Sequence, residues 1–350
     1  MSAKRSAIAV LMVAATALAA VSCGTPAQQP AQTTGPALAA AAAGQYPVTI
    51  SNCGKDYTYS KAPSRVVMMN GGSVAEVSSL VALGLGDKIV ANAQSYGASD
   101  EPGRAEQIAK LPTGGIKLND LQDIPRESML GLRPDLVIST YGGGFDPAGG
   151  FASREELSAI GANSYAPARN CGGAGAVDGT PTVEDSYAML RDLGKIFGVS
   201  AKADQLIADS QKQIAEVAAK VKGKPTPRVM LIIPGMAMGS GDFSSIGANG
   251  IWNDLIAKAG GVNAFGDSTK QLFANLSKEQ VAAAKVDAVV IVNYHNANPQ
   301  GDAEKLFAQF PQWQAAKDKR TIVLSDSIYL GPNNATAVQQ IAKTIHPDAF

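Results

Sequence analysis

Short apolar runs and segments of helical periodicity alternate along most of the chain. Runs typical of buried strands lie at 65–70, 88–93, 135–141 and 163–168, and helical spacing marks 73–84, 124–133 and 153–160. After residue 226 the alternation returns, with strands expected at 228–233, 287–292 and 321–325 and helices at 248–259, 277–285, 303–317 and 336–345. Alternating strands and helices are typical of α/β layers. The pattern predicts an α/β fold in two halves.

The two halves share a sequence repeat. RESMLGLRPDLVI (126–138) aligns without a gap with KEQVAAAKVDAVV (278–290), at an offset of 152 residues. Glu127 then falls on Glu279. Because the repeat agrees with the order of the expected strands, it indicates two lobes of one design.

A long amphipathic segment, residues 202–224, lies between the halves. Five apolar residues recur there at helical spacing, and prolines just beyond it prevent continuation of a helix. We expect one helix over 202–221 that restricts rotation between the lobes. The predicted domains are an N-terminal lobe at 45–201, the interlobe helix at 202–224 and a C-terminal lobe at 225–350. The apolar residues are Leu206, Ile207, Ile214, Val217 and Val221.

The N-terminal residues are typical of an export signal. Lys4 and Arg5 precede an apolar stretch at 7–21, which is too short to span a bilayer comfortably but suits a secretory signal at 1–22. The residues leading up to Cys23 resemble the lipobox of bacterial lipoproteins, which implies acylation of Cys23. The alternative is an ordinary cleaved signal with a cysteine nearby. The rest of 23–44 carries no charge and predicts a flexible linker.

The charge balance and the number of cysteines limit the classes of function further. The chain has 30 basic and 30 acidic residues, so no electrostatic footprint favours nucleic acid. Beyond Cys23 two cysteines remain, Cys53 and Cys171, and two cysteines in an exported chain predict one structural disulfide. The alternative is two unpaired thiols.

Several segments resemble the substrate-binding lipoproteins of ABC importers, in the iron–siderophore and cobalamin class, across nearly all of 46–350. The resemblance implies two Rossmann-like lobes joined by a single long helix, with a ligand cleft between the lobes. It also implies a monomer, lipid-anchored to the outer face of the cytoplasmic membrane, that serves an ABC permease dimer with its ATPase subunits. The segments are PSRVVMMNGGSVAEVSSLVALGLGDKIV, ESMLGLRPDLVI, SREELSAIG, LRDLGKIFGV, NDLIAKAGGVNAF and IHPDAF, with SNCGKD and ARNCGG similar to actinobacterial members.

Members of this family carry one acidic residue on each lobe that docks into arginine pockets of the two permease subunits. The matching positions here are Glu127 and Glu279, the pair that the repeat superposes. Two equivalent carboxylates suit a symmetric partner, and arginine–carboxylate pairing is bidentate and directional. The alternative is that both are solvated first-turn residues that oppose the helix dipole.

Ligands of open α/β sheets bind beyond the carboxyl ends of the strands. Aromatic rings and methionines there suit a bulky organic ligand, and an arginine suits anionic chelate oxygens. The alternative for each is an ordinary rim or packing residue. The candidates are Asn70, Tyr96, Tyr141, Phe145 and Arg169 in the first half, and Met236, Met238, Trp252, Tyr294, His295 and Tyr329 in the second.

His295 follows a strand directly and is a candidate ligand of haem iron or of an iron centre. The chain has only two histidines, however, and a dedicated Zn²⁺ or Mn²⁺ site usually gathers several His and carboxylate ligands. We therefore expect no direct metal site and no cofactor other than the transported ligand.

An enzyme is the distant alternative. GGSVA at 71–75 loosely resembles a nucleophile elbow with Ser73 as nucleophile and His295 as base, but Ser73 also fits a helix N-cap with Glu76 completing a capping box. No P-loop occurs, so energy for transport must come from a partner ATPase. The resemblance favours a non-enzymatic binding protein for a ferric siderophore. Cobalamin, haem and a deazaflavin-type cofactor precursor stay open.

Overall fold

The computed structural model describes residues 46–69, 73–94, 98–119, 123–167, 169–173, 179–234, 243–293 and 298–350. Residues 41–350 form one compact unit. Within the described ranges, no helix combines the length and the apolar character that a membrane span requires.

The N-terminal lobe contains a parallel four-stranded sheet in the order β4-β3-β5-β6. All four strands were expected from the apolar runs, although each is shorter than its run. The strands are β3 (Val66–Met68), β4 (Ile89–Asn92), β5 (Leu136–Ile138) and β6 (Asn163–Tyr165). The helices of this lobe are α1 (Ala75–Ala82), α2 (Arg104–Ala109), α3 (Arg126–Gly131) and α4 (Arg154–Ala159).

A separate antiparallel hairpin precedes this sheet, and the sequence analysis missed it. Strands β1 (Val48–Asn52) and β2 (Lys55–Tyr59) meet at a turn in which Cys53 and Gly54 have positive φ. Cys53 forms a disulfide with Cys171, which confirms the predicted pairing. The hairpin is thereby linked to the loop that follows β6.

The C-terminal lobe contains a mixed sheet in the order β10-β8-β7-β11-β12, with β9 paired to β7. The three predicted strands are parallel to one another, and β9 also runs parallel to β7. Strands β8 and β10 add antiparallel strands that the apolar runs did not reveal. The strands are β7 (Arg228–Ile232), β8 (Phe243–Ile246), β9 (Val262–Asn263), β10 (Phe273–Leu276), β11 (Ala288–Val292) and β12 (Thr321–Leu324).

The single helix predicted at 303–317 is wrong. The chain forms α9 (Pro299–Gln309) and α10 (Gln314–Lys317) instead, with a break around Phe310 and Pro311. Proline cannot donate the backbone hydrogen bond that a continuous helix needs at that position. The other expected helices form as α7 (Ile251–Lys258), α8 (Lys278–Ala283) and α11 (Asn334–Ile345).

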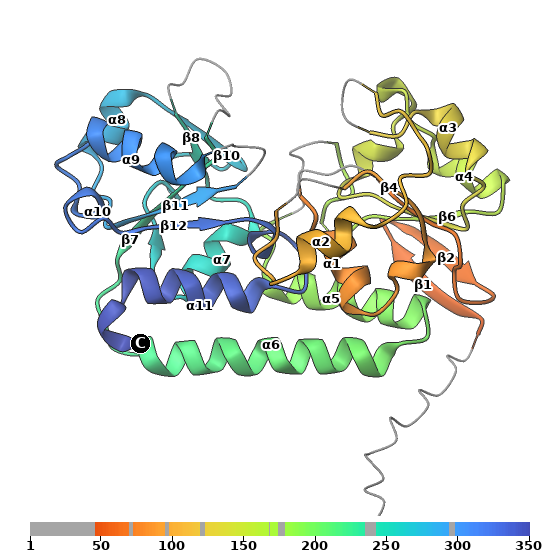
Figure 1. Ribbon diagram of the computed structural model, residues 1–350, viewed down its shortest axis with the longest axis horizontal. Coiled ribbons are helices and arrows are strands. Elements are labelled where there is room, and N and C mark those ends of the chain that lie inside the picture. Colours follow the sequence, from red (N-terminus) through yellow and green to blue (C-terminus); the bar gives the residue numbers. More distant parts are fainter. Residues whose placement is uncertain are drawn as a thin grey trace, which may run out of the picture. The chain divides into compact units, whose positions relative to one another are not determined.

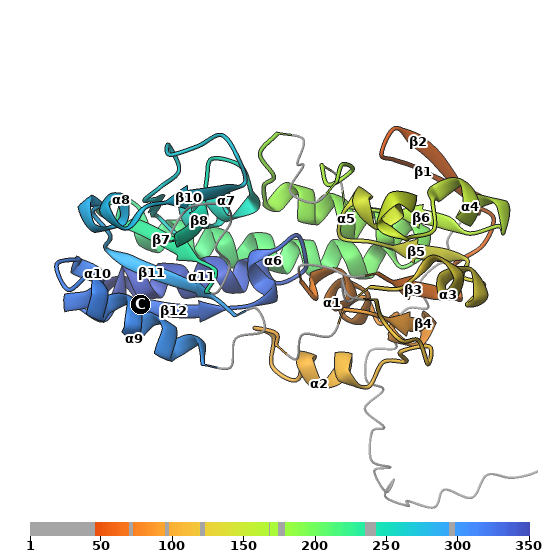
Figure 2. The same ribbon diagram turned by 90° about the horizontal axis from the view of Figure 1, so that it is seen from above.

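The long helix predicted between the lobes is confirmed as α6 (Ser200–Val221). It packs against both α5 (Val183–Ile196) and α11, which lie above it toward opposite ends in Figure 1, and Figures 1 and 2 show α6 running along both lobes. One buried cluster continues from the N-terminal lobe through these helices to the C-terminal lobe, and it includes Leu80, Leu190, Ile207, Ile256 and Ile341. The domain boundaries drawn at 201 and 225 stay a prediction.

The internal repeat of the sequence is also present in the structure. Helices α3 and α8 have the same bounds when shifted by 152 residues. Asp135 accepts a hydrogen bond from the backbone N–H of Arg65 (2.9 Å), and its equivalent Asp287 accepts one from Arg228 (2.8 Å). Each aspartate directly precedes one parallel strand and binds the backbone at the start of the neighbouring strand. Asp135 links β5 to β3 in this way, and Asp287 links β11 to β7.

Candidate functional site

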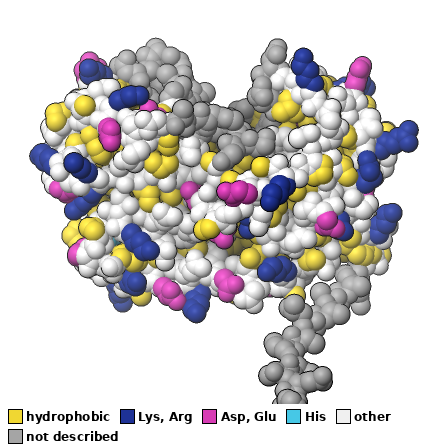
Figure 3. Space-filling view, viewed as in Figure 1, with side chains coloured by type: hydrophobic (Ala, Val, Ile, Leu, Met, Phe, Trp, Pro, Cys, Tyr) yellow, Lys and Arg dark blue, Asp and Glu magenta, His cyan; other side chains and the backbone are white. Residues whose placement is uncertain are grey.

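The carboxyl ends of the strands from the two lobes approach each other. The segment after β4 reaches the segment after β12, where Asp100 Oδ2 accepts a hydrogen bond from the backbone N–H of Ser325 (2.7 Å). At the edge opposite α6, the space-filling surface is hollowed between the lobes (Figure 3). The predicted site therefore lies where the strand ends of both lobes face one another.

Tyr141 follows β5 and begins a short 3₁₀ turn, η2 (Gly142–Phe145). A Cβ on Gly142 would lie 1.9 Å from the carbonyl oxygen of Cys171, and the N–H of Gly142 donates to the carbonyl of Asn170 (2.7 Å). The glycine run thus permits close approach of the loop at 169–173. Tyr141 is half-buried beside it.

Arg169 lies in that same loop with a positive φ of 70°. Its Nε donates to Asp185 Oδ1 at 2.8 Å, and its side chain is 43% exposed. The disulfide two residues away and this ion pair to the start of α5 hold the guanidinium in place. An anionic ligand at this position would share Arg169 with Asp185.

Phe145, another predicted contact, points into the core. Its ring is 5% exposed, and the guanidinium of Arg154 lies 4.3 Å from the ring centroid. This burial argues against a direct contact, because Phe145 fills the core that α4 covers.

Two predicted contacts of the C-terminal lobe lie together. Trp252, at the start of α7, and Tyr329, after the 3₁₀ turn η4 (Asp326–Ile328), pack edge to face with centroids 6.1 Å apart. Trp252 is 5% exposed, and within the described ranges its indole N–H has no hydrogen-bond partner. Tyr329 is half-buried whereas Trp252 is as buried as Phe145, so Tyr329 is the ring of this pair that a ligand can reach.

The remaining predicted contacts fall outside the described residues. They are Asn70, Tyr96, Met236, Met238, Tyr294 and His295, and the proposed lipidation site Cys23 falls outside them as well.

The capping box predicted at the start of α1 is wrong. The helix begins one residue later than that motif requires, with Val74 as the capping residue, and the Ser73 hydroxyl accepts from the N–H of Ala75 (3.1 Å). Ser73 is 2% exposed, so its hydroxyl does not project from the surface as a nucleophile elbow requires.

Glu76, the second residue of α1, is fully buried at the carboxyl end of the N-terminal sheet. Thr140 Oγ1 donates a hydrogen bond to its carboxyl group (3.1 Å). Burial raises its pKa to about 7, although hydrogen bonds from Thr140, Gln94 and Ser73 oppose that shift. The signal that sequence analysis passed over is the position of Glu76 among the apolar residues of α1.

Glu127 and Glu279 are both exposed at the second position of α3 and α8. In Figure 1 both helices lie at the edge of their lobe that is opposite α6. A hydrogen bond with its own backbone N–H is the main cause that lowers the pKa of Glu279. Both positions therefore present a carboxyl group from the same edge.

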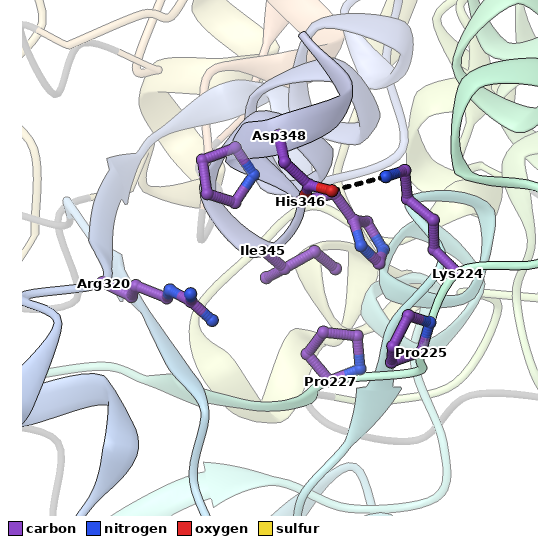
Figure 4. Close-up of a pocket in the computed structure, with 8 residues that line it drawn as sticks. Lys224, Pro225, Pro227, Arg320, Ile345, His346 and Asp348 are labelled. Atoms are coloured by element: carbon purple, nitrogen blue, oxygen red, sulfur yellow. Dashed lines mark hydrogen bonds and ion pairs between the residues drawn. The ribbon is translucent and has the colours of Figure 1, made fainter.

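A pocket of about 350 Å³ lies elsewhere on the C-terminal lobe (Figure 4). It includes Pro227 and Arg320, which precede β7 and β12, so it opens at the amino ends of these strands. One side is closed by the ion pair of Lys224 with Asp348 (2.6 Å). The strand-end rule therefore assigns it no part in the ligand site.

Within the described ranges, no group of three or more His, Cys, Asp and Glu side chains has an arrangement that could hold a metal ion. A metal carried as part of a chelate needs no such group.

The sequence pattern of the periplasmic binding protein family matches residues 72–327. The chain belongs to this family. It is 24% identical over 357 residues to YvrC of Bacillus subtilis strain 168, an uncharacterized ABC transporter substrate-binding lipoprotein, and the match covers 99% of each chain.

Solved structures are similar as well. An ABC-type Fe³⁺-hydroxamate transport protein from Saccharomonospora viridis has a TM-score of 0.67 at 22% identity, over 86% of this chain and 99% of that one. A periplasmic haem-binding protein from Pseudomonas aeruginosa has a TM-score of 0.61 at 25% identity, over 82% of this chain and 94% of that one. Membership of the periplasmic binding protein family accounts for the two lobes, and these similarities support the fold.

Proposed function

We propose that this protein is an extracytoplasmic solute-binding lipoprotein that captures a ferric siderophore and delivers it to an ABC permease. The observation that carries the proposal is the meeting of strand ends from two lobes in a member of the periplasmic binding protein family. The similarity to a Fe³⁺-hydroxamate transport protein favours a ferric chelate. Cobalamin, haem and a deazaflavin-type cofactor precursor are the alternatives.

The proposed site combines aromatic side chains with a positively charged guanidinium. Tyr329, half-buried and packed against Trp252, offers an aromatic face from the C-terminal lobe, and Arg169 offers a guanidinium from the N-terminal lobe. Aromatic surface suits the organic part of a chelate, and a guanidinium suits its anionic oxygens. Capture by preformed groups needs no catalytic residue, so the function is not enzymatic.

The proposed partners are a permease dimer and its ATPase subunits. Glu127 and Glu279 are the proposed docking residues, one for each permease subunit, because they hold equivalent exposed positions on the two lobes. Acylation of Cys23 would anchor the protein stably, since two or more acyl chains are sufficient for durable attachment. The uncharged linker would give the lobes reach above the membrane.

Equilibrium dialysis of the full chain in detergent tests the ligand class. The probes are a ferric hydroxamate, a ferric catecholate, haem and cobalamin, each at equal concentration, with the iron-free siderophores as controls. We expect saturable binding of one ferric siderophore class and none of its iron-free form. Saturable binding of haem or cobalamin alone would replace the iron–siderophore assignment with that ligand.

A further inference from the structure

Two aspartates of opposite lobes exchange hydrogen bonds across the interlobe contact. Asp100, from the segment between β4 and α2, accepts at Oδ2 from the backbone N–H groups of Ser325 (2.7 Å) and Ser327 (3.1 Å). The hydroxyl of Ser327 donates to the same oxygen. The N-terminal lobe thus supplies the acceptor that holds the start of η4.

Asp326 makes the reverse connection from the C-terminal lobe. Its Oδ1 accepts from the backbone N–H of Asp100 (2.8 Å), and its Oδ2 accepts from the hydroxyls of Ser78 (2.9 Å) and Ser99 (2.9 Å). Asn333 Nδ2 also donates to Oδ2, at 3.1 Å. Both carboxyl oxygens of Asp326 therefore accept hydrogen bonds from protein donors. Asp326 is 2% exposed, so these bonds replace the ones that water would make.

These contacts reach the aromatic pair through one short turn. The backbone N–H of Tyr329 donates to the carbonyl of Asp326 (3.2 Å), and Asn334 Nδ2 donates to the carbonyl of Tyr329 (2.8 Å). Tyr329 in turn packs on Trp252. The position of both rings therefore depends on η4, and the start of η4 is held from the other lobe.

We propose that Asp100 and Asp326 are positioning residues for ligand binding, which set Tyr329 and Trp252 of the C-terminal lobe against the N-terminal lobe. The inference rests on the proposed function, because it assumes that the ligand binds where the strand ends of the two lobes meet. Neither aspartate needs to touch the ligand. Their contribution is to prepare the site before the ligand arrives, which reduces the ordering cost of binding.

The two aspartates differ in a way that makes the inference testable. The described contacts of the Asp100 carboxyl all fall on Oδ2, so Asp100→Asn can keep its amide oxygen there and place the NH₂ group at the other position. Asp326 accepts on both oxygens, so Asp326→Asn must turn an NH₂ group toward a donor. An isosteric amide is tolerated in the first case and disruptive in the second.

The experiment uses the full chain in detergent, in a Trp313→Phe background that leaves Trp252 as the reporter. Trp313 stacks on Phe310 in a different core cluster, so it does not report on η4. The variants are Asp326→Asn, Asp100→Asn and Asp100→Ala, the last of which removes the acceptor from a half-buried residue in case Asp326→Asn does not fold. Trp252 emission, acrylamide quenching, circular dichroism and dialysis with a ferric hydroxamate are measured for each.

We expect Asp326→Asn and Asp100→Ala to shift Trp252 emission to longer wavelength and to increase quenching, while circular dichroism stays native. Binding of the ferric hydroxamate should weaken about tenfold, which corresponds to ~1.4 kcal/mol. Asp100→Asn should match its parent in every readout. Folded Asp326→Asn and Asp100→Ala proteins with parental emission and affinity, or an Asp100→Asn protein as impaired as Asp326→Asn, would overturn the inference. If no probe binds the parent, the proposed ligand fails, whereas Trp252 emission still decides the positioning role.

Discussion

The hydroxyl of Thr140 donates a 3.1 Å hydrogen bond to the carboxyl of Glu76, and this contact joins α1 to the segment after β5. Both residues lie at the carboxyl end of the N-terminal sheet. Glu76 is 1% exposed, so an ionised carboxyl there loses nearly all contact with water. Desolvation disfavours the charged form, which is why burial raises its pKa to about 7.

Glu76 therefore makes stability depend on pH in a specific direction. Its folded pKa of about 7 lies above the ordinary 4.5, so the folded state keeps a proton that the unfolded state has already released between these values. The bound proton stabilises the folded state fully below pH ~4.5, and this contribution to the free energy of unfolding, up to roughly 3 kcal/mol, is lost as the pH rises to ~7. Glu76→Gln carries no such proton, so its stability relative to the wild type should rise across that window.

Urea unfolding at pH 4.5, 6 and 8 measures this difference. Glu216→Gln, on an exposed position of α6, is the matched control and should follow the wild type at every pH. A constant stability difference between Glu76→Gln and the wild type would show that the buried carboxyl does not titrate in this range.

Most of the fold could be predicted from local sequence because its parallel strands are continuous apolar runs. Segments such as DAVVIV are buried on both faces of the sheet, so their sequence indicates a strand even when the neighbouring strands are unknown. The hairpin of β1 and β2 was missed because it alternates, with Tyr57 and Tyr59 buried and Asp56 and Thr58 exposed over only five residues. Helix α5 was missed because polar residues such as Asp185 and Ser186 are buried in it.

The site was less predictable because its contacts join residues far apart in sequence. Nothing local indicates that Asp185 pairs with Arg169, or that Asp326 accepts from Ser78 across 248 positions. Phe145 follows a strand as a ligand contact would, yet the turn at Gly142–Phe145 directs its ring into the core. The strand-end rule selects one edge of each sheet, but the path of each loop decides which side chains reach that edge.

Gly142 should tolerate no side chain. A Cβ there would lie 1.9 Å from the carbonyl oxygen of Cys171, and backbone held by a disulfide cannot easily move away. We expect Gly142→Ala to lower the free energy of unfolding by about 1–3 kcal/mol, the usual range for overpacking. Gly173→Ala is the matched control, because a Cβ at Gly173 meets nothing within 4 Å. Equal stability of the two variants in urea unfolding would contradict the close approach.

The disulfide between Cys53 and Cys171 should contribute strongly to stability. It links positions 118 residues apart, and cross-links that close long loops remove the most entropy from the unfolded chain. Replacement of both cysteines by alanine should cost about 4–5 kcal/mol in the simple entropic model. Thermal unfolding of the variant, compared with the wild type with and without a reductant, measures this. A reductant that lowers the melting temperature of the wild type but not of the variant attributes the effect to the disulfide.

Glu127 and Glu279 should matter for delivery and not for capture. Both are exposed first-turn residues of helices that contribute none of Arg169, Trp252 and Tyr329, so Glu127→Ala and Glu279→Ala should leave ligand affinity unchanged. Loss of a carboxylate from an arginine pocket leaves a buried charge unpaired, so each variant should weaken permease binding about tenfold or more, and the double variant further.

Glu184→Ala controls for the helix dipole, because Glu184 is an exposed second-position residue of α5, in the layer packed against α6. Ligand uptake by cells that carry the cognate permease, measured beside dialysis of the purified variants, separates the two functions. Reduced uptake for Glu127→Ala and Glu279→Ala with wild-type uptake for Glu184→Ala supports docking through the repeat. Equal uptake for all three would mean that the two carboxylates only oppose their helix dipoles, since that is the one role they share with Glu184.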